Sequence, residues 1–143
     1  MGRLKLLSKQ WIVDEDNNII IGEGRSEILE LVQQTGSLNQ VAKMLKMSYK
    51  AVWGKVKATE KALNARILDT DRKMGSQLTP EGRDLLERYN RLKKECLVED
   101  DRIFSLFSQG SPDTELGKFP AAFGAEFLFY LLHGYSPIWR RSG

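Results

Sequence analysis

Basic side chains gather on one segment of this chain at spacings suited to binding phosphate. Residues 38–66 contain seven basic residues and a single acidic one, Glu60. At about 100° per residue on a helical wheel, Lys50, Lys57 and Lys61 fall within about 40° of one another. Ammonium groups on one ridge of a helix can neutralise nucleic-acid phosphates and release their counterions. Because lysine-rich helices are also common as plain solvated faces, the ridge by itself leaves both interpretations open.

The start of the same predicted helix carries further groups that could read DNA. Ser48 and Tyr49 can donate to a phosphate, helped by the helix dipole, or Tyr49 can contact a base edge. Lys50 lies near the helix start and could reach guanine O6 and N7 instead of a phosphate. Gly54 lies inside an exposed ridge, where glycine lowers helix stability by about 1 kcal/mol relative to Ala. Close approach to DNA would explain a glycine at this position; the alternative is a neutral position that merely weakens the helix. Trp53, on the flank, packs either against a thymine methyl or sugar or in the semi-buried core.

Three predicted helices must hold this ridge in place. Apolar spacing predicts a first helix over residues 25–35. Ser37 is a suitable N-cap for the second helix and Ser48 for the third, at about residues 49–64, and a short turn joins the two. This arrangement predicts a helix-turn-helix, in which Ser37 and Asn39 would also donate to phosphate. The buried stripe of the third helix is expected at Val52, Val56, Thr59 and Leu63.

A hairpin is predicted on each side of these helices. Before them, β-like runs at residues 4–13 and 19–21 flank a turn rich in Asp and Asn. After them, residues 66–70 and 76–79 could form two short strands, which is the size of a wing. The basic residues at its tip are Arg72 and Lys73.

Two residues near the first hairpin are expected to have structural roles. Trp11 is expected to plug the core between hairpin and helices. Arg25 is expected to pair with an acidic neighbour, such as Glu23 or a hairpin carboxylate, in preference to DNA.

A long amphipathic helix is predicted from Pro80, with Thr79 as its N-cap, to about residue 107. It is too long for a small domain of its own, so its apolar stripe indicates a partner, most simply the same helix of a second subunit. The alternative is that the following tail folds back over it. The expected dimer-interface residues are Leu85, Tyr89, Leu92, Cys96, Ile103 and Phe107.

The length of 143 residues allows one domain with an appendage. We expect a mainly α fold with small β elements: residues 1–107 as a winged helix-turn-helix domain, with the dimerisation helix at about 80–107. Residues 108–143 are expected to be a linker and aromatic-rich tail without a separate ligand-binding domain. About 13 tail residues could be helical, roughly 20 Å, which is short of a hydrocarbon core of about 30 Å. A short packing helix is therefore preferred to a membrane anchor.

Composition argues against several classes of function. One His and one Cys give no basis for a metal site, a cofactor or a thiol enzyme. The densest acidic run, residues 99–101, lies on a predicted helix and is interpreted as a solvated patch or a new helix start, so no enzyme is predicted. The first residues lack the apolar run of a secretory signal, which predicts a cytoplasmic protein.

The segment from Gly22 to Val56 resembles the N-terminal DNA-binding domain of ModE-type, molybdate-responsive transcriptional regulators, which is related to LysR-type winged helices. The similar elements are GxGR before the first helix, TGSL before the second, and Met47-Ser48-Tyr49-Lys50 followed by Val52-Trp53. The likeness extends from Trp11 to about Leu92 and includes LTPEGRDLL after the wing.

The resemblance implies a homodimer that binds operator DNA sequence-specifically, regulates transcription, and is linked to molybdate or metal-oxyanion transport genes. It implies that the helix after Ser48 enters the major groove while the wing contacts the backbone or minor groove. The family wing is usually glycine-rich and basic, whereas here Gly75 remains beside Arg72 and Lys73, so the wing departs from the family pattern. Residues 108–143 are too few for the family's molybdate-sensing domain, so sensing does not follow. The alternative is a winged-helix interaction or adaptor module that no longer binds DNA.

Overall fold

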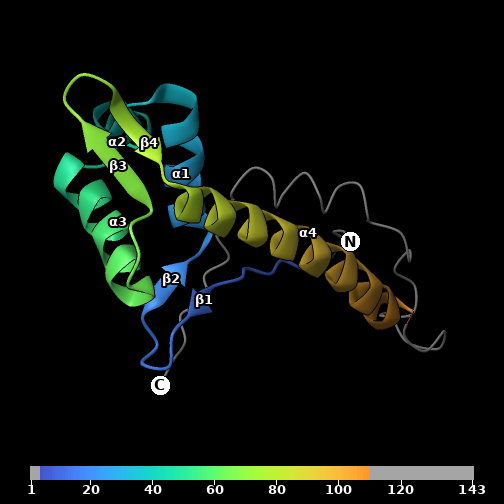
Figure 1. Cartoon of the computed structure of the whole chain (residues 1–143). Helices are drawn as coiled ribbons and strands as arrows, with labels where there is room; N and C mark the ends of the chain where they lie inside the picture. Colours follow the sequence, from blue (N-terminus) through green and yellow to red (C-terminus); the bar gives the residue numbers. More distant parts are fainter. Residues whose placement is uncertain (1–3, 110–143) are drawn as a thin grey trace. The chain divides into compact units, whose positions relative to one another are not determined.

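The computed structural model describes residues 4–109 and confirms the predicted fold class, which is mainly helical with two small antiparallel hairpins (Figure 1). By its packing the described part of the chain divides into a unit of residues 9–91 and a second unit of residues 4–8 and 92–109. The elements are β1 (Ile12–Val13), β2 (Ile19–Ile21), α1 (Glu23–Thr35), α2 (Leu38–Met44), α3 (Tyr49–Leu63), β3 (Leu68–Asp71), β4 (Gly75–Leu78) and α4 (Pro80–Ser108).

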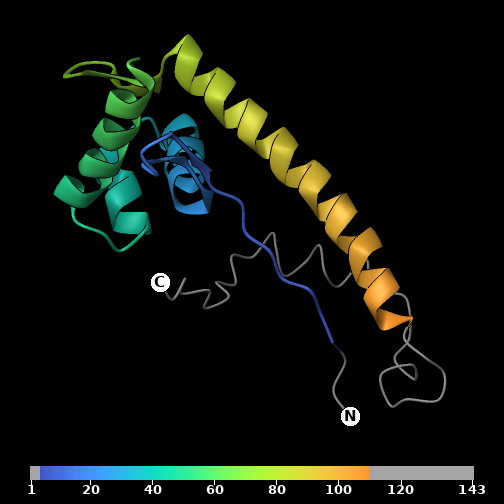
Figure 2. The ribbon, with the colours of Figure 1, turned by 90° about the horizontal axis from the view of Figure 1, so that it is seen from below.

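Local capping marks the end of α1 and the starts of α2 and α3, and both serine caps were predicted. The hydroxyl oxygen of Ser37 accepts from the backbone N–H of Gln40 at 3.3 Å, and that of Ser48 accepts from Ala51 at 3.1 Å. Gly36 ends α1 in the left-handed conformation, with φ of 68°. The three helices pack against one another and form the predicted helix-turn-helix (Figure 2).

The first hairpin is shorter than the sequence suggested. Residues 4–11 form no strand, because β2 offers just three residues for pairing. The turn is built as expected, since the Asp14 carboxylate accepts from the backbone N–H groups of Asp16 at 2.9 Å and Asn18 at 2.8 Å. The predicted long strand over residues 4–13 was therefore wrong, while the turn was right.

The core of the first unit is an apolar cluster between α1, α2, α3 and the start of α4. Val52, Val56 and Thr59 lie in it or beside it, as predicted. Leu63 does not, because α3 ends there and Asn64 turns the chain with φ of 48°, which leaves Leu63 36% exposed. The principal buried residues are Ile21, Ile28, Leu29, Val32, Leu38, Val41, Val52, Val56, Ile67, Leu68, Leu86 and Tyr89.

Trp11 does not plug this core. Its side chain is 51% exposed and lies against Gly22, where a Cβ atom would collide with the indole ring. Ile21, the last residue of β2, occupies the interior instead. The prediction for Trp11 was wrong because the pattern did not show which side of the short hairpin faces the core.

The wing hairpin is present and is fastened to α1. Strands β3 and β4 pair in antiparallel register, with Asp71 opposite Gly75. Next to the tip, the Ser76 N–H donates to the Gly36 carbonyl at 2.8 Å. Gly75 has φ of 79°, and a Cβ atom there would collide with the same carbonyl, so this position requires glycine.

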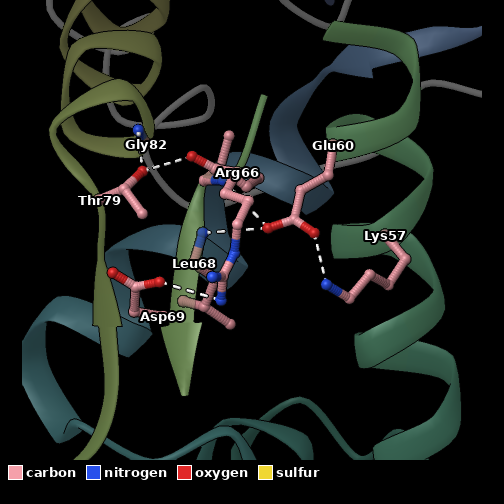
Figure 3. A network of polar contacts seen from close by, with 8 residues as sticks. Lys57, Glu60, Arg66, Leu68, Asp69, Thr79 and Gly82 are labelled. Carbon is pink, nitrogen blue, oxygen red and sulfur yellow. Dashed lines mark hydrogen bonds and ion pairs between the residues drawn. The ribbon is translucent and has the colours of Figure 1, made fainter. Parts of the chain in front are cut away.

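Helix α4 begins where predicted. The Thr79 hydroxyl accepts from the Gly82 N–H at 3.0 Å, and its O–H donates to the Arg66 carbonyl at 2.6 Å (Figure 3). Tyr89, expected at a dimer interface, is instead 2% exposed in the core and donates to the Gln10 carbonyl at 3.0 Å. Leu85 is half-buried against the same cluster. The expectation for Tyr89 is corrected, because the first turns of α4 complete the domain's own core, while the interface role of the partly exposed Leu85 stays a prediction.

In the second unit, Leu97 packs with Leu6, and Phe104 is buried. Among the expected interface residues of this unit, Cys96 is half-buried, and Leu92, Ile103 and Phe107 are exposed. No helix within residues 4–109 is both long and apolar enough to cross a membrane. The predictions for the tail beyond residue 109 lie outside the described residues.

Candidate nucleic-acid interface

Most of the residues predicted to contact DNA lie exposed on the helix-turn-helix and the wing tip. Ser37 is half-buried, and both serine caps use an oxygen lone pair, so capping does not consume the hydroxyl proton. The exposed residues are Asn39, Ser48, Tyr49, Lys50, Gly54, Lys57, Lys61, Arg72 and Lys73.

Gly54 leaves a gap on the exposed face of α3. A Cβ atom built at this position would meet nothing within 4 Å. Packing within residues 4–109 therefore gives no reason for a glycine here. An unfilled position in the middle of an otherwise regular helix is suited to a surface that approaches closely from outside.

Two aromatic rings line the flank of α3. Tyr49 and Trp53, one turn apart, are stacked with ring centroids 6.4 Å apart and planes inclined by 12°. Trp53 is half-buried and packs against the core cluster, while Tyr49 is exposed. The semi-buried interpretation of Trp53 is thus supported, and its outer neighbour Tyr49 is presented to solvent beside Lys50.

Lys57 is not the free ammonium that the helical wheel suggested. Its Nζ lies 2.6 Å from the Glu60 carboxylate and 4.4 Å from the centroid of the Trp53 ring. The side chain is 44% exposed, so its outward direction was right. What the wheel missed is that one carboxylate and one ring already hold this cation.

Glu60 is a residue of the candidate interface whose contacts sequence reasoning overlooked. Its side chain is 9% exposed, and its second oxygen accepts from the N–H groups of Ile67 at 3.0 Å and Leu68 at 3.2 Å (Figure 3). Burial raises the pKa of this carboxyl, but the hydrogen bonds from Lys57 and the two amides outweigh burial and lower the pKa below its usual value. The available signal was a lone acid, three residues after a lysine, in a basic segment.

An open hollow of about 370 Å³ lies beside this pair, at the end of α3. Arg66 lines it and pairs with Asp69 at 3.0 Å, but both side chains are well exposed, so the pair contributes little stability. Lys61 also lines the hollow, and no ion pair of Lys61 is present among the described residues. The hollow therefore has a cationic rim.

The wing tip keeps its two cations on a fixed turn. The Asp71 carboxylate accepts from the backbone N–H groups of Lys73 at 2.6 Å and Met74 at 2.9 Å. These bonds, Met74's first, lower the pKa of Asp71. The tip is thus an ordered turn with exposed Arg72 and Lys73.

Arg25 bonds to carbonyls instead of the expected carboxylate. Its guanidinium donates to the Ile19 and Ile20 carbonyls and, at 2.9 Å, to the Thr59 hydroxyl. Burial lowers the pKa of Arg25. This side chain joins the first hairpin to α3, which agrees with a structural role but corrects the predicted partner.

The residues described contain no cluster of three or more His, Cys, Asp or Glu side chains that could hold a metal ion. The geometry is that of an exposed helix with cations, a gap and a capped N-terminus, next to a hairpin with two cations. Such a surface can bind a polyanion by charge and by shape.

Comparison with known proteins gives two matches. Residues 25–83 match the model of the lysR family of bacterial regulatory helix-turn-helix proteins. Over 95 residues the chain is 30% identical to the molybdenum transport protein ModE of Azotobacter vinelandii. The match covers 64% of this chain and 35% of that protein, so the chain spans about a third of its length.

Proposed function

We propose that this chain, which carries a LysR-type helix-turn-helix domain over residues 25–83, binds double-stranded DNA and regulates transcription. The observation that carries the proposal is α3, which follows α2 after a short turn and presents Lys50, Gly54 and Lys61 to solvent. The second helix of a helix-turn-helix enters the major groove with its N-terminal residues on base edges. Here those residues are Ser48, Tyr49 and Lys50.

The contacts divide by chemistry. Phosphate contacts are assigned to Lys61 of α3, to Ser37 at the N-cap of α2 and to Asn39 in α2. Such contacts position the protein on the duplex without reading its sequence. Tyr49 and Lys50 are assigned to base edges, and Trp53 supports Tyr49 from the core side. The wing cations are assigned to the backbone or minor groove beside the helix; they are Arg72 and Lys73.

The test is a salt titration of binding to duplex DNA. A protein that neutralises Z phosphates loses affinity with a slope of about −0.9Z in log K against log salt. We expect a steep slope that becomes shallower by about 0.9 in Lys61→Met. Absence of duplex binding at low salt would refute the proposal and favour the adaptor alternative, which the short wing supports.

Dimerisation through α4 is part of the proposal. Exposed apolar residues on its second half, Ile103 and Phe107 among them, support a second copy as the partner. Two recognition helices would then read half-sites about 34 Å apart or a multiple of that distance. Sedimentation of the full chain at micromolar concentration should show a dimer, and Phe107→Glu should shift it to monomer. A monomeric wild type contradicts this part.

The name of the Azotobacter relative connects that protein with molybdenum transport. We therefore propose genes of molybdate or metal-oxyanion transport as first targets to examine. Recovery of chromosomal fragments bound to the protein in its own cell would test this directly, since such genes would be enriched among them.

A further inference from the structure

We propose that the Glu60 carboxylate keeps the Lys57 ammonium from binding DNA. The Lys57–Glu60 pair instead holds the root of the wing, which is Ile67 and Leu68, against α3. Lys57 is then a positioning residue and not a phosphate ligand. This inference rests on the proposed DNA binding. Of the three lysines on the basic ridge, Lys50 and Lys61 then contact DNA and Lys57 does not.

The Glu60 carboxylate joins two elements through its two oxygens. One oxygen accepts the backbone N–H groups of Ile67 and Leu68, at the start of β3, and the other faces Lys57 Nζ at 2.6 Å (Figure 3). Both amides belong to the segment that leads into the wing. A single side chain of α3 therefore sets where the wing begins.

Lys57 completes this carboxylate's set of partners. Because Glu60 is 9% exposed, removing the cation would take a close partner from the carboxylate, which water from the open hollow replaces only in part. The Lys57 ammonium also lies over the Trp53 ring, and the Trp53 ring is stacked with that of Tyr49. A phosphate that attracted Lys57 would have to break both contacts.

Lys50 and Lys61 differ from Lys57 in this respect. Both are exposed on the same helix, and neither forms an ion pair within the described residues. Contact with DNA, at a base edge for Lys50 or at a phosphate for Lys61, costs them no internal partner. Lysines on the same ridge of α3 thus have two roles, DNA contact and positioning of the wing, and the place of Glu60 decides which lysine takes which role.

The salt slope of duplex binding separates these roles. Lys57→Met keeps an apolar stem near Trp53 and should leave the slope unchanged, while the matched control Lys61→Met should make it shallower by about 0.9. Glu60→Gln keeps an oxygen for the two amides but loses the charge. It should release the ammonium and steepen the slope by about 0.9, and adding Lys57→Met to it should restore the wild-type value.

The outcomes are distinct. If Lys57→Met makes the slope shallower by about as much as Lys61→Met, Lys57 is a phosphate ligand and the inference is wrong, although DNA binding stands. If a folded Glu60→Gln keeps the wild-type slope, the carboxylate is not what withholds the ammonium, and the inference is again wrong. If Glu60→Gln fails to fold by circular dichroism, Lys57→Met decides. A wild type that does not bind duplex DNA removes the proposed function itself.

Discussion

Replacing Gly54 by alanine should change folding stability and DNA affinity in opposite directions. Within the described chain the new methyl group meets nothing within 4 Å, and Gly54 lies inside α3, so the change carries no packing cost there. Alanine is favoured over glycine in a helix interior by about 1 kcal/mol. Gly54→Ala should therefore raise the free energy of unfolding by about that amount, measured by urea denaturation.

The effect on DNA follows from the same empty space. If the duplex approaches α3 closely at Gly54, a methyl group overpacks that contact, and overpacking costs about 1–3 kcal/mol. That range corresponds to about 5- to 160-fold weaker binding at 25 °C. Fluorescence anisotropy with a labelled duplex at fixed salt would measure the loss.

Gly24→Ala is the matched control. Gly24 is also helical, and a Cβ atom there also meets nothing within 4 Å, but it lies in α1 and outside the proposed interface. It should leave affinity unchanged. Unchanged affinity in Gly54→Ala would remove Gly54 from the interface, and a loss of stability would show that the space beside α3 is occupied.

Other perturbations test the wing and its root. Gly75→Ala should lower the free energy of unfolding by more than about 1 kcal/mol, because φ is 79° and the methyl group would collide with the Gly36 carbonyl; a wild-type urea midpoint would contradict this geometry. Folding lowers the pKa of Glu60 from 4.5, so its stabilisation is complete above that value and is lost as the pH falls through the lower folded pKa. Urea midpoints measured from pH 7 to pH 3 should thus fall more for the wild type than for Glu60→Gln, and parallel curves would show that the carboxylate is not stabilised in the fold.

Features set by neighbours in the sequence were predictable. Ser37 and Ser48 act as helix caps through contacts three residues away, and the buried stripe of α3 follows from a fixed angle per residue. Arg72 and Lys73 could be placed at a wing tip because a short turn lies between two strand-like runs. Each of these inferences needed no knowledge of how distant segments meet.

Features set by distant segments were not predictable in the same way. Glu60 could be seen as the lone acid of its region, but its role depends on amides seven and eight residues later that fold back toward α3. Tyr89 belongs to a regular apolar stripe, yet its burial and its contact with the distant Gln10 carbonyl show that this part of the stripe faces the domain's own core. The helical wheel gave the direction of Lys57 and could not give its partner.

The wing is fastened at both ends, by Glu60 where it begins and by the Gly36 carbonyl next to its tip. Two anchors restrict the movement of this hairpin, so we expect α3 and the wing to keep a fixed opening between them in the proposed complex with DNA. On a duplex whose grooves do not match that opening, the nucleic acid has to bend or twist, and the energy of that deformation reduces affinity. Base steps that deform easily would then be favoured even at positions that no side chain touches.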